Sequence, residues 1–248
     1  MEICLYSAKY FLRPYEDDDY LSSVCRVIQG FKYIVYRPNH GLCHSIRQGF
    51  LARDIITLIM KDLNHPLHSW VIECIAKDKY FEVKTAILSS FQRSGRQSEI
   101  SSSENPSLYA KYERNDRYNF IDGIDPCYFN DDSNEIERWS YALIWNSDNN
   151  DLMTDNLRII LKAAHTLDLR RIPKFDADRV KRETSNILMI EQNSRMLKIL
   201  WNQSGKYLNI SGDRDMVNNR TDWEDRFFTL QNDPAKLYFS LRKGKLTC

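Results

Sequence analysis

The 248-residue sequence predicts a single domain of mainly α-helical fold. The chain contains only 8 Gly and 7 Pro, which is fewer than the frequent turns of an all-β architecture usually need. Long stretches instead carry apolar residues at intervals of three to four, the spacing of one face of a helix. No internal repeat and no low-complexity linker divides the chain. We therefore expect one all-α domain.

The first half of the chain contains one clear helical pattern and one ambiguous one. Apolar periodicity predicts a helix from Gly41 to Leu63, with Asn39 as its N-cap and Pro66 beyond its end. The pattern over residues 68–94 predicts either one long helix or two. Residues 94–107 are polar and rich in serine, which predicts a loop.

The second half contains three further helical patterns. After a mixed stretch, a helix is predicted to begin with Ser133 or Asn134 as its cap. Residues 150–172 form a strong amphipathic pattern that Pro173 stops. Residues 176–205 predict another helix, which ends at Gly205.

These elements suggest how the chain is organised. We expect a helical domain over residues 1–205, with its functional motifs within 37–171, and a C-terminal extension over residues 206–248 that packs on the same domain. The pattern near the end of that extension fits a short strand or a helix.

Composition excludes several classes of function. A formal net charge of +1 argues against a general nucleic-acid binder. The 6 cysteines are scattered without a CxxC pair, which argues against a disulfide scaffold and a zinc ribbon. The N-terminus lacks the apolar core of a secretory signal, and no stretch has the roughly 18 apolar residues of a transmembrane helix.

The stretch RPNHGLCHSIR, residues 37–47, has the composition of a site for a phosphate or a metal. His40 and His44 are four residues apart, so they share one face of a helix, and Arg37 and Arg47 flank them. The start of a helix favours bound anions, and arginine stabilises a phosphoryl transition state. A metal is the second interpretation, although HExxH and the dipeptide HD are both absent. The third is an ordinary helix cap with surface histidines.

Two further stretches are candidates. In AAHTLDLRR, His165 lies on the apolar side of a helix, and Asp168 follows three residues later, close enough to orient an imidazole. The alternative is a histidine that belongs to the core. The loop after residue 93 contains Arg96, Glu99 and Glu104, and its composition alone fits a solvated loop.

Together, the three stretches resemble the phosphodiesterase domain of the SidE family of Legionella effectors, over residues 37–171. The resemblance implies an all-helical domain that needs no metal or other cofactor and acts in phosphoribosyl-linked serine ubiquitination. It implies that His40 is the nucleophile, that His165 is the general acid, and that Glu99 orients or polarises one histidine. Glu104 competes for the last role.

The resemblance also implies a substrate and a place of action. Its partners would be ubiquitin or a ubiquitin-modified host protein and a phosphoribosyl or AMP group, after secretion into the host cytosol. We expect removal of the modification rather than its addition, because the chain is too short for the family's transferase domain. The alternatives are another nucleotide-linked phosphodiester substrate and a non-catalytic binding module. The residues expected to contact the phosphate or to support those that do are Arg37, Asn39, His44, Arg47, Arg96 and Asp168.

Overall fold

The computed structural model describes residues 42–93, 103–123, 129, 133–145, 151–172 and 175–211. Within these ranges the fold is entirely helical, with eight α-helices and no strand, which confirms the predicted fold class. The helices are α3 (Leu42–Lys61), α4 (His68–Lys77), α5 (Phe81–Ser90), α6 (Pro106–Gly123), α7 (Ser133–Ser140), α8 (Leu152–Asp168), α9 (Ala177–Leu188) and α10 (Arg195–Ser211).

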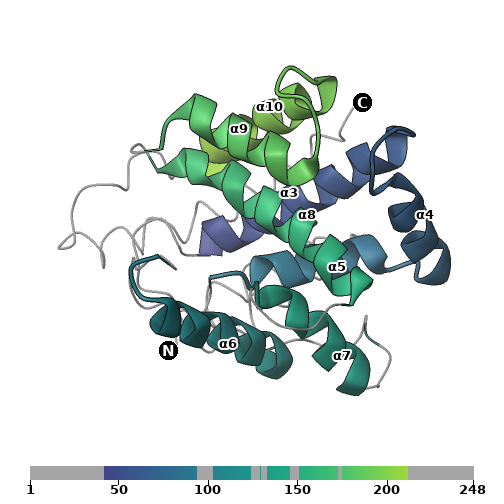
Figure 1. Ribbon diagram of the computed structural model, residues 1–248, viewed down its shortest axis with the longest axis vertical. Coiled ribbons are helices and arrows are strands. Elements are labelled where there is room, and N and C mark those ends of the chain that lie inside the picture. Colours follow the sequence, from purple (N-terminus) through teal and green to yellow (C-terminus); the bar gives the residue numbers. More distant parts are fainter. Residues whose placement is uncertain are drawn as a thin grey trace.

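Helices α3 and α8 form the centre of the molecule. Figure 1 shows α9 and α10 on one side of them and α5, α6 and α7 on the other. Leu51, Ile55 and Ile59 of α3 are fully buried, as its apolar periodicity predicts. Ala163 and Ala164 of α8 are also fully buried, and such small side chains let neighbouring helices approach closely. The core therefore fixes the relative position of α3 and α8.

Helix α8 begins and ends where its sequence predicts. The Asp151 side chain accepts a hydrogen bond from the Met153 N–H at 3.2 Å, which caps the helix. A 3-10 turn, η3 (Leu169–Arg171), tightens its C-terminal end shortly before Pro173.

The mixed stretch after residue 106 forms helix α6. Pro106 is its first residue, where the missing proline N–H costs no hydrogen bond within the helix. Phe120 of α6 packs edge-on against Phe91 and Phe129, and Phe129 in turn packs against Trp139 of α7. This aromatic row joins α6 and α7 to α5, so α6 is stabilised by packing rather than by a clear apolar period.

Two of the sequence predictions are resolved or corrected. The ambiguous 68–94 pattern is two helices, separated at Asp78, whose backbone is extended. The single helix predicted over 176–205 is wrong, because the chain adopts a left-handed conformation at Met189 (φ 57°) and starts α10 at Arg195. Gly205 does not end α10, which continues to Ser211. A Cβ at Gly205 would lie 2.7 Å from Arg170 Nη1, so glycine here permits close packing.

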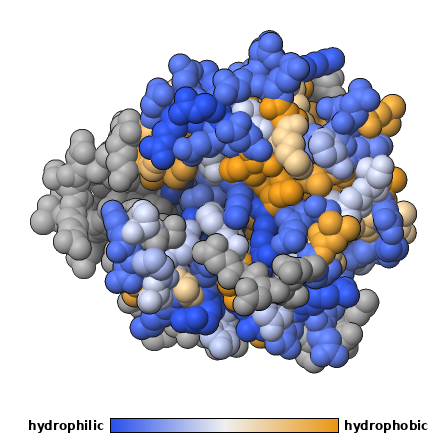
Figure 2. All heavy atoms as spheres, viewed as in Figure 1, coloured by the Kyte–Doolittle hydropathy of each residue, from blue (hydrophilic) through white to orange (hydrophobic). Residues whose placement is uncertain are grey.

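The described surface is mostly hydrophilic. Figure 2 shows polar side chains over α9 and α10 and an apolar area in the middle of the same face, where α8 crosses in Figure 1. Among the described residues, no helix combines the length and apolarity needed to cross a membrane.

A buried Asp54–Tyr207 contact between α3 and α10 makes stability depend on pH. The Tyr207 hydroxyl lies 2.5 Å from Asp54 Oδ2, and burial raises the pKa of Asp54 to about 6 from 3.8. The folded state therefore binds more protons than the unfolded state between these values, so this group's contribution to stability falls as pH rises through this range and is constant above it.

We expect Asp54→Asn to remove this dependence. The free energy of unfolding of this variant, minus that of the parent, should rise by about 2 kcal/mol between pH 4 and pH 7, which urea denaturation at each pH would measure. A constant difference between the two proteins across this range would contradict the assignment.

Candidate active site

The C-terminal half of α8 lies against the N-terminal half of α3, and this contact brings two buried histidines together. His44 of α3 is 2% exposed and His165 of α8 is 7% exposed. Their ring centroids are 5.8 Å apart, with the planes at 68°. Two of the predicted motifs, distant in sequence, thus meet at one place.

Asp168 anchors His44 at this place. One carboxylate oxygen of Asp168 lies 2.5 Å from His44 Nδ1 and 3.1 Å from Nη1 of Arg171. The other oxygen accepts a hydrogen bond from Arg47 Nε at 2.6 Å, and all three charged side chains are buried. Charge-assisted hydrogen bonds of this kind hold both partners firmly in a dry interior. They fix the His44 ring with Nδ1 toward Asp168 and Nε2 on the opposite side.

His165 has a neutral partner instead. Nε2 of Gln48, a fully buried side chain of α3, lies 2.7 Å from His165 Nδ1. In this orientation the amide donates to an unprotonated Nδ1. Among the described residues, nothing hydrogen-bonds Oε1 of Gln48, and rotation of the amide would let that oxygen accept from a protonated Nδ1. The contact therefore suits a histidine that gains and loses a proton.

The expectation that Asp168 orients the neighbouring His165 needs correction. Asp168 does orient an imidazole, but it is that of His44. A residue three positions further along a helix is rotated by about 60° around the axis, and here that rotation directs the carboxylate toward Arg47 of α3.

A second cluster adjoins His165 around the ring of Trp145. The Trp145 ring lies edge-on to His165, with centroids 6.1 Å apart. Arg93 Cζ lies 4.4 Å from the Trp145 centroid and 5.0 Å from that of Tyr109. The ammonium of Lys162 lies 5.0 Å from the Trp145 centroid. Two cations thus pack on the aromatic ring that borders His165.

The cluster around Trp145 contains carboxyl groups as well as cations. The backbone of Arg93 is in the left-handed region (φ 68°), and its N–H donates to Asp116 at 2.9 Å, which fixes its position. Burial raises the pKa of Glu113 to about 7, against the opposing effect of Arg93, so Glu113 carries only part of a negative charge at neutral pH. Burial and the neighbouring charge of Arg158 lower the pKa of Lys162. Two cations, Arg93 and Lys162, therefore border the Trp145 ring beside His165.

Most of the other predicted site residues lie outside the described ranges. Glu104, the alternative carboxylate, is exposed in the turn before α6. The predicted site residues that lie outside the described ranges are Arg37, Asn39, His40, Arg96 and Glu99.

Comparison with known families decides the assignment of the chain. Residues 14–217 match the SidE phosphodiesterase (PDE) domain. The chain belongs to the SidE phosphodiesterase family. No curated protein and no solved structure matches it. The family resemblance drawn from the three motifs is thereby confirmed. Membership implies a phosphodiesterase that acts on phosphoribosyl-ubiquitin linkages.

The sequence of this SidE-family domain did not single out three residues of the site. Gln48 lies four positions after His44, and helical spacing would have placed it on the same face. Arg171 lies at the end of a helical pattern, where a basic residue is common for the helix dipole alone, whereas its guanidinium binds Asp168. Trp145 lies after a short 3-10 turn, η2 (Tyr141–Leu143), where no periodic pattern indicates its direction.

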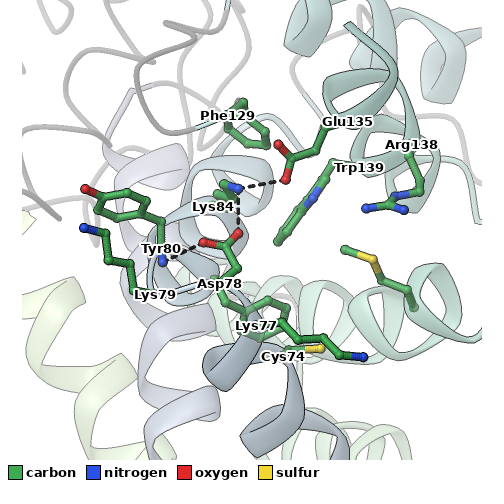
Figure 3. Close-up of a pocket in the computed structure, with 12 residues that line it drawn as sticks. Cys74, Lys77, Asp78, Lys79, Tyr80, Lys84, Phe129, Glu135, Arg138 and Trp139 are labelled. Atoms are coloured by element: carbon green, nitrogen blue, oxygen red, sulfur yellow. Dashed lines mark hydrogen bonds and ion pairs between the residues drawn. The ribbon is translucent and has the colours of Figure 1, made fainter. Parts of the chain in front are cut away.

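A pocket of about 490 Å³ lies at the N-terminal end of α5, and no histidine lines it. Figure 3 shows Lys84 between Asp78 and Glu135, with its ammonium 2.5 Å and 2.8 Å from their carboxylates. The same ammonium lies 5.0 Å from the Phe129 centroid and 5.9 Å from that of Trp139. The acidic and aromatic groups of this pocket thus already surround a cation of the protein itself.

The described residues contain no group of three His, Cys, Asp or Glu side chains placed to hold a metal ion. His65 and His68, the other described histidines, lie in the connection after α3 and at the start of α4. His68 Nδ1 lies 3.0 Å from the carbonyl oxygen of Ile59, a contact at the end of α3.

Proposed function

We propose that this chain is a metal-independent phosphodiesterase that removes phosphoribosyl-ubiquitin from serine and also cleaves the pyrophosphate of ADP-ribosylated ubiquitin. The observation that supports it best is the pair of buried histidines, His44 and His165, each contacted at Nδ1 by a separate buried side chain. The different partners, a carboxylate and an amide, suit two histidines with different tasks. Family membership supports the choice of substrate.

We assign the bond-making steps by resemblance to the family. His40 attacks phosphorus, a P–N bond forms, and the P–O bond to serine breaks. The electron pair stays on the serine oxygen, which takes a proton from His165. Water then attacks phosphorus, the P–N electrons return to His40, and His165 accepts the proton from the water. Glu99 orients one histidine in this proposal, with Glu104 as the competing residue.

The charge of the phosphoryl group would be met by polar side chains. We propose that His44 contacts a phosphate oxygen, while Arg47 and Asp168 hold its ring in place from behind. Arg37, Asn39 and Arg96 are proposed as further phosphate ligands. A loose phosphoryl transition state depends mainly on such positioning and charge, which is why no metal is invoked.

We propose removal as the main direction for a chemical reason. Hydrolysis requires only water as the second acceptor of the phosphoribosyl group. Transfer requires in addition that a serine of the target be bound in line with phosphorus.

The decisive experiment uses the purified chain with two substrates, in the presence of EDTA. One is a serine-linked phosphoribosyl-ubiquitin conjugate, and the other is ADP-ribosylated ubiquitin. Conjugate cleavage or AMP release that is lost in His40→Ala would support the proposal and give the direction. Turnover of neither substrate would overturn it. It would favour another nucleotide-linked phosphodiester or a non-catalytic binding module instead.

The same assay predicts a bell-shaped pH profile for kcat/KM. One histidine must be neutral to attack phosphorus and the other must be protonated to donate to the leaving oxygen. Activity should therefore fall on both sides of an optimum. A flat profile between about pH 5 and pH 9 would contradict a two-histidine mechanism.

We also propose that the protein acts in the cytosol of a host cell, in keeping with its membership of an effector family. A reporter enzyme fused to the chain and activated only by a host cofactor would test delivery. No reporter signal in host cells infected with a bacterium that expresses the fusion would contradict it.

A further inference from the structure

We propose that Lys162 binds the leaving phosphate when the substrate is a pyrophosphate, and thereby separates the two substrate classes of this site. The inference rests on the proposed function. Lys162 would favour cleavage of the pyrophosphate substrate, a role that differs from the proton donation assigned to His165.

Lys162 is placed beside the proposed general acid. It precedes His165 by three residues on α8, so the two side chains are neighbours on the helix surface, about 60° apart around its axis. Both border the same ring, because the Trp145 centroid lies 5.0 Å from Lys162 Nζ and 6.1 Å from the His165 centroid. A leaving group that lies along the Trp145 ring would therefore meet both side chains.

The surroundings of Lys162 make it a binder of anions. The side chain is half-buried, and no hydrogen bond or ion pair joins its ammonium to a described residue. Arg93 packs on the same tryptophan ring, and Arg158, one turn earlier on α8, forms an ion pair with Asp155 at 2.7 Å, so Arg93 and Lys162 are the two cations that border Trp145 among the described residues. Glu113, the nearby buried carboxyl group, is only partly ionised at neutral pH. A phosphate placed here would gain attraction that the protein itself leaves largely unused.

The two substrates make different demands on this side of the site. When the P–O bond of a pyrophosphate breaks, the electron pair stays on the bridging oxygen, which becomes a terminal oxygen of AMP. A phosphate monoester has a second pKa of about 6, so this oxygen needs charge stabilisation more than a proton. A serine leaving group instead departs as an alkoxide unless it is protonated, so it depends on His165.

The test compares Lys162→Met with the parent on both substrates. We expect kcat/KM on ADP-ribosylated ubiquitin to fall by about 100-fold, and that on the serine-linked conjugate to change by less than about threefold. Lys162→Arg should restore most of the loss, because it keeps the charge.

Lys181→Met is the matched control, because Lys181 also packs on a tryptophan, at 4.9 Å from the Trp201 centroid, but lies on α9. It should leave both activities unchanged. Equal losses on both substrates for Lys162→Met, or no loss on either, would overturn the proposal.

A binding measurement separates this proposal from the function on which it rests. Titration of inorganic pyrophosphate by calorimetry should give binding that Lys162→Met weakens at least tenfold and Lys181→Met does not. If the parent cleaves neither substrate but this difference appears, the anion site stands and the proposed function fails. If the parent cleaves both substrates and pyrophosphate binds both variants equally, the function stands and the assignment of Lys162 fails.

Discussion

Replacing His165 by glutamine is expected to slow cleavage of a serine-linked phosphoribosyl-ubiquitin conjugate by about 100- to 10,000-fold, the usual contribution of a general acid. Glutamine fills a similar space and still hydrogen-bonds the buried Gln48 amide, which now contacts Nδ1 at 2.7 Å. It has no proton to give to the serine oxygen at neutral pH. Release of free substrate protein, followed by gel electrophoresis under single-turnover conditions, would measure the chemical step.

His68→Gln is the matched control for this variant. His68 is partly buried and, like His165, makes a contact at Nδ1, here with a backbone carbonyl oxygen at 3.0 Å, but it lies at the start of α4. Its activity should equal that of the parent. An equal loss in single-turnover AMP release by the His165 variant from ADP-ribosylated ubiquitin, whose leaving group needs no proton, would show that His165 is not the leaving-group acid.

Periodicity predicted which residues share a helix face, and this part of the prediction is confirmed. The buried positions of α3 and α8 follow from apolar spacing alone, and so does the end of α8 before Pro173. The same spacing misjudged the stretch over 176–205. The left-handed residue there is Met189, which carries no glycine or proline signal in the sequence.

The pairing of the site residues depended on contacts between helices, which spacing along one helix does not contain. His165 and Asp168 are neighbours in sequence, yet their partners are Gln48 and His44 on another helix. Which side chain of α8 meets which side chain of α3 is decided by the rotation and offset of two packed helices. Arg93 and Trp145 come from connections without a period, so their meeting beside His165 was not predictable from the pattern.

Replacing Asp168 by asparagine is expected to lower the free energy of unfolding by about 3–5 kcal/mol, the usual cost of removing one partner from a buried ion pair. The fully buried carboxylate contacts two guanidinium groups and one imidazole. Asparagine matches its shape, but it removes the negative charge that Arg47 and Arg171 contact in the interior. Urea denaturation at pH 7, followed by circular dichroism, would measure the change.

The control is the same substitution at Asp176, an exposed N-cap that accepts a hydrogen bond from the Arg179 N–H at 3.0 Å. Asparagine caps helices as well as aspartate, so this variant should differ from the parent by less than about 0.5 kcal/mol. If Asp168→Asn were equally mild, the two buried guanidinium groups would have to be neutralised by other residues. Asp168 would then serve to orient His44 rather than to stabilise the fold. A loss of stability together with a loss of turnover is what we expect, because the same carboxylate does both.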